Sequence, residues 1–414
     1  TCFALPTATR VNNPNPTGAG ATSADSTNIT ATQCRDAFIQ NAGVISFKSN
    51  GYTIGAAPGR SFRGMFYDVA TGVVFSQGAY EFTRVNGDIV VSYKSKTVAG
   101  DEVFDTFALR LDTDGKLKQI GNQYDYPGGV SAFHQLRKFI TLGQSAWDYY
   151  STGYSLNVDH ITGGSGVDGS IFDRVEVTTP RGNVLTLKPV AGSSYLPLVK
   201  SGTVTRTSFV RLNSVYADSA NVADPAVKDT SLFFADRTLF TDAYIATIPA
   251  QSVWKFDYFV AGNTGSTPDA TQNYKTRARA LTIAELQTKG VATLTPTAVT
   301  TVSSGADGTG RLPFSGESVA TLNWTVGTGA LPPTKIQIWG VFNDGTHSGS
   351  FNDSANVGST ARTGNIGCSS SGASDYHCQS GLFTTTTLLN GAHLWARDTS
   401  GREFASFYAM YQLP

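Results

Sequence analysis

Charge is scarce in this sequence and evenly balanced. Of the 414 residues, 15% are charged, and 31 Lys and Arg offset 31 Asp and Glu to a formal net charge of zero. Soluble domains carry roughly 25% charged residues, so uncharged Thr, Ser, Asn and Gly must supply much of the polar surface. A nucleic-acid-binding protein needs a basic excess or stripe, so nucleic acid is not an expected partner. Nor does any apolar run reach the roughly 20 residues that span a bilayer, so no membrane span is expected.

Thiols are also few. The four cysteines are Cys2, Cys34, Cys368 and Cys378, and the stretch between positions 34 and 368 has none. That gap excludes a cysteine metal cluster and a cysteine nucleophile there. We expect two disulfides, Cys2–Cys34 and Cys368–Cys378, which require an oxidising compartment. The chain opens with Thr1-Cys2, which we interpret as a mature N-terminus, and a lipid-modified Cys2 is the alternative. We therefore expect an extracellular or cell-surface location, with the periplasm as a further option.

Motifs for catalysis and metal binding are missing as well. Five histidines are scattered at positions 134, 160, 347, 377 and 393 without the close ligand pair that zinc sites usually show. The Gly163–Gly166 stretch contains a serine but no following helix, so a turn explains it better than a nucleophile elbow. A glycosidase uses two carboxylates that act together, and no close pair stands out among the scattered acidic residues. We predict no cofactor, no metal and no catalytic residue, and expect a non-enzyme more than an enzyme.

What the sequence does have is short alternating runs bounded by turn residues, which predict a mainly β, multi-domain protein. We expect four parts: a Thr/Gly/Pro-rich arm (1–34) closed by a disulfide, a β-rich domain (35–142), a β-sandwich (143–290) and a second β-sandwich (291–414). The strands are expected at 73–75, 79–83, 89–93, 106–111, 154–158, 174–178, 184–187, 207–212, 243–248, 253–260, 274–281, 320–326, 335–339, 393–397 and 404–408.

Two helices are predicted. In Ser131–Ile140, the residues Phe133, Leu136 and Ile140 recur at helical spacing. A second, short helix should follow Thr282, because Glu285 three residues later completes a capping box and Lys289-Gly290 supplies a stop.

The C-terminal block resembles immunoglobulin-like and fibronectin type III sandwiches. The resemblance rests on an aromatic on an early strand (Trp324 in 320–326), a Pro332-Pro333 bend, and a closing hairpin that joins 393–397 to 404–408. It covers about 115 residues and implies an antiparallel β-sandwich.

Residues 88–126 resemble the closing strands of nuclear-transport-factor-2-like (SnoaL-like) domains, which are cone-shaped α+β folds. The resemblance rests on 88–93, on 104–120 and on the Asp114-Gly115-Lys116 turn. The opening helices of that family are not evident in residues 43–75. If the resemblance holds, the strand that ends near residue 124 approaches a pocket.

A small-ligand site is therefore predicted at Tyr124, Asp125 and Tyr126, which precede a Pro-Gly-Gly bend. Asp125 would act as a base, and the tyrosines would bind a ring. The alternative is a strand terminus whose aromatics pack on Phe133.

Two functions follow. The first is a secreted or cell-surface, non-catalytic modular β protein that serves as a structural, adhesive or assembly subunit, such as a filament subunit. The second is an extracellular small-ligand or carbohydrate-binding protein, or a hydrolase, with its pocket in the first domain. The expected partners are further copies of the chain, another surface protein or a polysaccharide.

Overall fold

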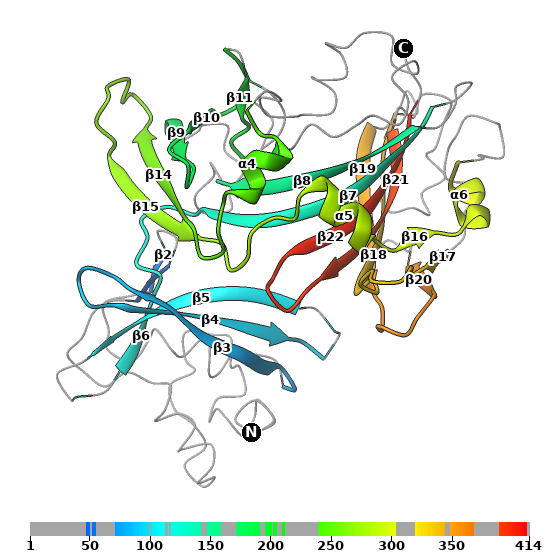
Figure 1. Ribbon diagram of the computed structural model, residues 1–414, viewed down its shortest axis with the longest axis horizontal. Coiled ribbons are helices and arrows are strands. Elements are labelled where there is room, and N and C mark those ends of the chain that lie inside the picture. Colours follow the sequence, from blue (N-terminus) through cyan, green and yellow to red (C-terminus); the bar gives the residue numbers. More distant parts are fainter. Residues whose placement is uncertain are drawn as a thin grey trace, which may run out of the picture. The chain divides into compact units, whose positions relative to one another are not determined.

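The computed structural model describes residues 47–49, 52–54, 71–98, 100, 102–111, 115, 117–141, 147–158, 171–190, 195–200, 202–204, 209–211, 239–303, 319–343, 348–367 and 389–411. These form two compact units, Thr1–Gly128 and Gly129–Pro414 (Figure 1). Nearly all the regular structure is strand, and the described helices are short. The prediction of a mainly β protein is therefore confirmed.

The first unit contains a four-stranded antiparallel sheet in the order β3-β4-β5-β6. Its strands are β3 (Val74–Thr83), β4 (Ile89–Lys96), β5 (Glu102–Leu111) and β6 (Leu117–Gly121), and a small hairpin joins β1 (Phe47–Ser49) to β2 (Tyr52–Ile54). Asn86, Gly87 and Asp88 form the turn between β3 and β4: Gly87 has φ +87° and donates its N–H to the carbonyl of Arg84. Val90, Ala108 and Ile120 form a small core.

Asp88 fixes this turn to the sheet. Its carboxylate is fully buried and receives two hydrogen bonds from the Arg110 guanidinium on β5, at 2.5 and 2.8 Å. Asn86 donates to the same carboxylate at 3.0 Å. A buried carboxylate is tolerated only when it is paired and hydrogen-bonded in this way.

The second unit is built on a seven-stranded sheet in the order β13-β8-β7-β22-β21-β18-β19. Only the β22–β7 pair is parallel. The strands are β7 (Gly129–Thr141), β8 (Trp147–Asn157), β13 (Phe209–Arg211), β18 (Lys335–Asn343), β19 (Ser348–Asn356), β21 (Leu389–Arg397) and β22 (Glu403–Tyr411).

This sheet corrects the expected domain boundaries. Strands from all three predicted domains pair within it, and the boundary predicted at 142/143 falls between β7 and β8, which are hydrogen-bonded neighbours. The boundary at 290/291 likewise separates β8 from β18 and β21 of the same sheet. Sequence spacing shows where strands begin and end, but it does not show which distant strands pair.

The helix predicted at Ser131–Ile140 is wrong, because these residues lie in strand β7. Residues 132–136 are all buried, so both faces of β7 are covered along this stretch, and β7 pairs with β8 on one side and with β22 on the other. The two ladders of backbone hydrogen bonds outweigh the local helical spacing of the apolar residues.

The opposite error occurs at 243–248, where a strand was predicted and the structure has helix α4 (Asp242–Ala246). Thr241 caps this helix by accepting the N–H of Tyr244, and Ile245 is buried. By contrast, helix α5 (Ile283–Lys289) confirms the prediction at Thr282. The hydroxyl of Thr282 and the carboxylate of Glu285 form the capping box, and Gly290 with φ +71° ends the helix.

Two further sheets flank the seven-stranded sheet. The first has the order β10-β9-β14-β15, and the second has the order β16-β17-β20. Their strands are β9 (Phe172–Thr178), β10 (Val184–Leu187), β14 (Val253–Val260), β15 (Ala270–Lys275), β16 (Thr293–Leu294), β17 (Val319–Thr325) and β20 (Thr363–Gly367); the short hairpin β11 (Val199–Lys200) with β12 (Thr203–Val204) and helix α6 (Pro296–Ser303) complete the elements. The strand bounds predicted at 184–187 and 253–260 are confirmed.

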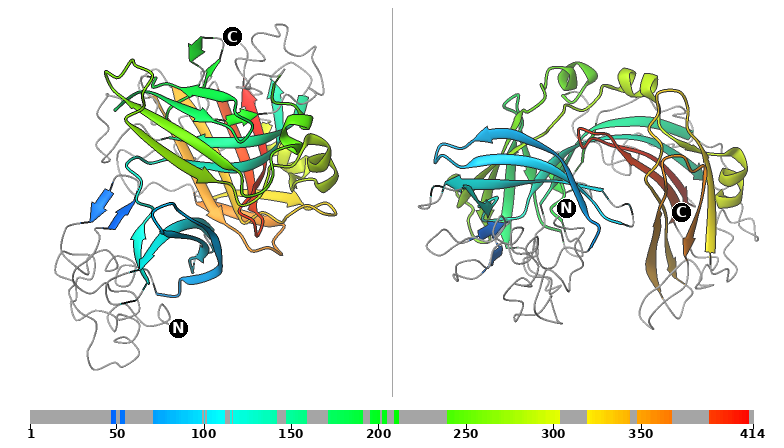
Figure 2. Two further views of the ribbon diagram at one scale, coloured as in Figure 1. Left: turned by 60° about the vertical axis from the view of Figure 1, so that its left-hand side comes forward. Right: turned by 90° about the horizontal axis from the view of Figure 1, so that it is seen from below.

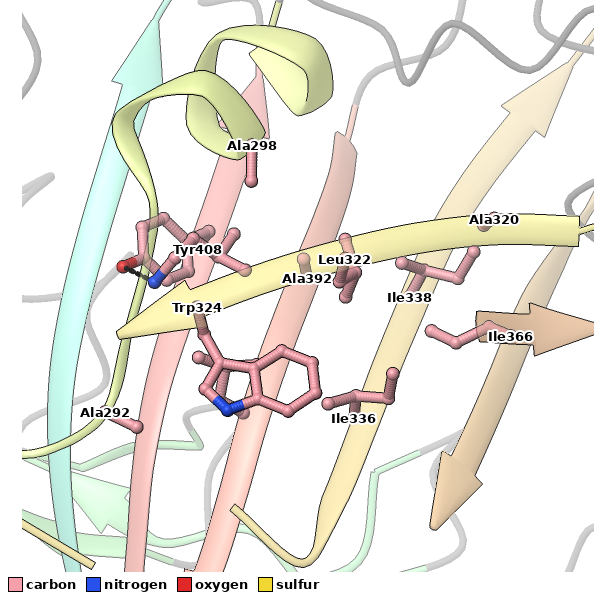
Figure 3. Packing of buried hydrophobic residues seen from close by; sticks show 12 residues of the cluster. Ala292, Ala298, Ala320, Leu322, Trp324, Ile336, Ile338, Ile366, Ala392 and Tyr408 are labelled. Carbon is pink, nitrogen blue, oxygen red and sulfur yellow. Dashed lines mark hydrogen bonds between the residues drawn. The ribbon is translucent and has the colours of Figure 1, made fainter. Parts of the chain in front are cut away.

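The main core lies between the three-stranded sheet and one face of the seven-stranded sheet (Figure 3). Trp324 of β17 is 1% exposed and packs with Ile336 and Ile338 of β18. Tyr408 of β22 belongs to the same cluster, and its hydroxyl accepts the N–H of Leu294 at 2.9 Å. One face of β18, β21 and β22 therefore packs against this core. The residues between those core residues point to the opposite face of the sheet.

This core leaves no room at Gly364. A Cβ built there would lie 2.7 Å from Cδ1 of Ile336, 2.9 Å from Cγ1 of Val357 and 3.2 Å from Cη2 of Trp324. We expect Gly364→Ala to lower the free energy of unfolding of the second unit by about 1–3 kcal/mol through overpacking. The matched control is Gly367→Ala on the same strand, where no atom lies within 4 Å. Urea unfolding of both variants tests this, and equal stabilities would contradict it.

His134 joins the seven-stranded sheet to the segment before α5. It is fully buried, its Nδ1 lies 2.8 Å from the carbonyl oxygen of Glu403, and its Nε2 accepts the N–H of Leu281 at 2.8 Å. A backbone N–H can only donate, so Nε2 carries no proton and Nδ1–H donates to Glu403. Burial lowers the pKa of His134 to about 3. This histidine therefore serves the fold as a neutral connector.

Candidate binding face

The strands β18 and β21 show two different faces to their surroundings. Ile336 and Ile338 of β18 point into the core, so Gln337 and Trp339 lie on the opposite face. On β21, His393 alternates in the same way with buried Ala392 and Leu394. Register brings the outward residues into rows across the sheet, because Gln337 pairs with His393, His393 with Phe407, and Phe407 with Arg137.

We call this patch the aromatic face. It consists of six half-buried side chains, contributed by β7, β18, β21 and β22: Arg137, Gln337, Trp339, His393, Trp395 and Phe407. In the right-hand view of Figure 2, these strands curve into an arch with α6 on its outer side. The core cluster that includes Ala298 of α6 lies on that outer side, so the aromatic face lines the inner side of the arch.

A directional hydrogen-bond network holds the face rigid. The indole N–H of Trp339 donates to Nε2 of His393 at 2.9 Å. An indole N–H cannot accept, so His393 is neutral with its proton on Nδ1. That proton is donated to Oε1 of Gln337 at 3.0 Å, and Oε1 also accepts the indole N–H of Trp395 at 3.1 Å. The Gln337 amide nitrogen then donates to Oδ1 of Asn352 on β19.

Burial lowers the pKa of His393 to about 3, and the positive charge of Arg137 acts in the same direction. The imidazole therefore stays neutral at physiological pH, as the network requires. His393 holds the two tryptophans in place and is a poor candidate for proton transfer or metal binding.

Trp339 packs directly against Gly391, its partner on the neighbouring strand, and the absence of a side chain at Gly391 makes this possible. A Cβ added to Gly391 would overlap three atoms of the Trp339 ring, Cε2, Cζ2 and Nε1, at nearly equal separations. These three atoms form the edge of the indole that carries its N–H, so this edge lies over the glycine. The contact with Gly391 and the hydrogen bond to His393 together fix the position of the indole. A fixed indole is a platform on which a planar or ring-shaped ligand can stack.

Phe407 connects this platform to a cation. Its ring centroid is 5.5 Å from that of Trp339 and 4.2 Å from that of His393. The guanidinium carbon of Arg137 lies 4.0 Å from the Phe407 centroid, a cation–π contact. Nη1 of Arg137 donates to Oε1 of Gln135 at 3.3 Å. The face thus combines an aromatic platform, amide groups and an oriented positive charge.

The predicted ligand residues lie elsewhere. Tyr124, Asp125 and Tyr126 occupy the connection between β6 and β7. Tyr124 is half-buried beneath Arg84, whose guanidinium carbon is 4.8 Å from the ring, and burial raises the pKa of Tyr124. The side chain of Asp125 is exposed, and Tyr126 is half-buried. Nothing in this arrangement tests their binding role, which stays a prediction.

The four cysteines, and with them both predicted disulfides, lie outside the described residues. Within the described residues, no group of three or more His, Cys, Asp or Glu side chains could hold a metal ion. The described helices include none that is long and apolar enough to cross a membrane.

Sequence reasoning missed the aromatic face, although a signal was present. The runs Lys335–Trp339 and His393–Trp395 share an alternation in which aliphatic residues are interleaved with Gln, His and Trp. An ordinary half-exposed strand has small polar or charged residues at its outward positions. Trp and His at those positions indicate that the second face of the sheet also has a role.

No protein-family model matches the chain, and no curated protein matches it. The predicted resemblances to immunoglobulin-like, fibronectin type III and nuclear-transport-factor-2-like domains are thus not confirmed. The described part of residues 71–128 contains strands and no helix.

Two solved structures show a distant likeness. One is a 1.5-MDa bacterial ice-binding adhesin described for retention on the host cell surface; it is 10% identical, with 78% of this chain and 74% of that chain covered and a TM-score of 0.18. The other is a Ca2+-stabilized adhesin with which an Antarctic bacterium reaches out and binds ice; it is 10% identical, with 79% and 57% covered and a TM-score of 0.16. At these scores the likeness carries no argument about function.

Proposed function

We propose that the protein is a secreted or cell-surface, non-catalytic adhesive β protein that binds carbohydrate through its aromatic face. The observation that carries the proposal is the half-buried Trp339 indole, which packs against Gly391 and is hydrogen-bonded to His393. A sugar ring has a patch of C–H groups on its face and hydroxyls around its rim. An indole face suits the first, and neighbouring amide and guanidinium groups suit the second.

The rigidity of the face supports this function. Both tryptophan N–H groups, the His393 ring and the Gln337 amide are engaged within the network. A ligand therefore meets side chains that are already ordered, and binding costs less conformational entropy. A neutral His393 and the absence of a metal-binding group among the described residues give no support for hydrolysis at this face.

The experiment is binding of the full chain to an array of neutral and acidic polysaccharides from plant, bacterial and animal sources. We expect binding to at least one of them, with loss of binding in a Trp339→Ala variant that keeps its circular dichroism spectrum. If no polysaccharide is bound, or if the variant binds as the parent does, the proposed function is wrong.

A further inference from the structure

We propose that Arg137 makes the aromatic face selective for acidic sugars, by pairing its guanidinium with the carboxylate of a uronic acid whose ring stacks on Trp339. This inference rests on the proposed function and specifies its ligand class. Trp339 and Arg137 both contact Phe407, at 5.5 and 4.0 Å. The platform and the cation are thus separated by a single aromatic ring, a distance on the scale of one or two sugar units.

Arg137 is suited to this role by its orientation. Its guanidinium is held against Phe407 and is hydrogen-bonded to Gln135, which is buried. A guanidinium fixed in this way presents its N–H groups in a plane, and that geometry matches the two oxygens of a carboxylate. Because stacking has already ordered the side chain, pairing with a carboxylate loses less entropy than it would for a mobile lysine.

The charge of the surrounding sheet favours an anionic ligand. By register, Lys335 of β18 and Arg397 of β21 lie on the same face as Arg137. Among the side chains that the structure describes there, the one carboxylate is Glu403, and Arg397 lies 3.7 Å from it. The lowered pKa of His393 agrees with a positive field at the centre of the face, because Arg137 contributes to it.

Lys138, the residue next to Arg137, does not place its positive charge on this face. Lys138 points to the other face of β7 and forms an ion pair with Asp148 at 2.8 Å. Lys138 therefore carries its charge on the face opposite Arg137, and it provides a matched control in the adjacent position.

The test compares binding of the full chain to polygalacturonate and to alginate, each beside its carboxyl methyl ester. Esterification removes the charge and keeps the rings. We expect the parent protein to bind at least one of the acids 10-fold or more tightly than its ester, with the difference shrinking as salt is raised. Arg137→Gln should remove this preference, so that acid and ester bind with affinities within twofold of each other, whatever the common affinity of the variant. Arg137→Lys should keep part of the preference, and Lys138→Gln should keep all of it.

The outcomes separate the two proposals. Equal affinity of the parent for acid and ester, or a preference that survives in Arg137→Gln, overturns the role of Arg137 while carbohydrate binding stands. Binding of neutral polysaccharides alone does the same. The parent protein gives the acid-against-ester comparison without any substitution, so a variant that fails to fold does not prevent a decision. Absence of binding to every polysaccharide overturns the proposed function itself.

Discussion

Replacement of Trp339 by alanine is expected to weaken carbohydrate binding by about 30-fold or more, the loss of roughly 2 kcal/mol that is typical of a central aromatic anchor. The variant should remain folded, because the Trp339 side chain lies on the face opposite the core formed by Ile336, Ile338 and Trp324. Isothermal titration calorimetry with the polysaccharide selected by the array measures the loss.

A second variant disturbs the same platform without removing the indole. Gly391→Ala places a methyl group where the ring now lies, so the indole must tilt and its hydrogen bond to His393 must break. We expect a loss of binding comparable to that of Trp339→Ala. The control is Val253→Ala, which removes an apolar side chain that is 44% exposed on a different sheet. Parent-like binding by both Trp339→Ala and Gly391→Ala would contradict the proposed site.

Acidification is expected to destabilise the second unit through His134. Burial lowers the pKa of His134 to about 3 in the folded state, whereas an unfolded histidine titrates near 6.5. Between these values the unfolded state binds a proton that the folded state does not, so stability falls as the pH drops below about 6.5. Between pH 7 and pH 4 the loss from this residue is roughly 3 kcal/mol. Urea unfolding at the two pH values measures it.

The variant for this test is His134→Gln, which keeps an amide in the core and cannot titrate. Its stability should change less between pH 7 and pH 4 than that of the parent, by roughly 3 kcal/mol. Glu403 has the opposite effect, because burial raises its pKa to about 7 and its protonation on acidification favours the folded state. This contribution is present in both proteins and cancels in the comparison. An equal acid response would contradict the account, as would an imidazole NMR titration of His134 in the parent with a pKa near 6.5.

Local pattern was enough to locate many strands. The alternation of Val253–Val260, in which Trp254, Phe256 and Tyr258 are fully buried, predicts β14 to the residue. The capping box at Thr282 and Glu285 is equally local, and it predicts α5. Both features depend on residues a few positions apart, and this is the range over which sequence patterns are informative.

Pairing between distant strands was not predictable in this way. β7 and β22 lie side by side in parallel although Phe133 and its partner Glu403 are far apart in the sequence. Local spacing in Ser131–Ile140 favoured a helix because nothing in that stretch reveals the two neighbouring strands. The domain boundaries failed for the same reason, since one sheet collects strands from most of the chain.

The candidate site shows the same limit. Tyr124, Asp125 and Tyr126 attracted a prediction because they are adjacent in the sequence. The aromatic face is assembled from Arg137, Gln337 and His393, which register alone brings into one row. The outward Trp and His residues of β18 and β21 were visible in the sequence, but their convergence depends on strand order.

The central claim is that carbohydrate stacks on Trp339. The chain has five tryptophans, at positions 147, 254, 324, 339 and 395, so a 15N-labelled sample gives five indole N–H signals. The direct measurement is a titration of these signals with an oligosaccharide from the polysaccharide that the array selects, with Trp339→Phe used to assign the key signal. The signals of Trp339 and Trp395 should shift in proportion to saturation, and those of the fully buried Trp254 and Trp324 should stay in place. A saturated complex in which the Trp339 signal does not move would contradict the account.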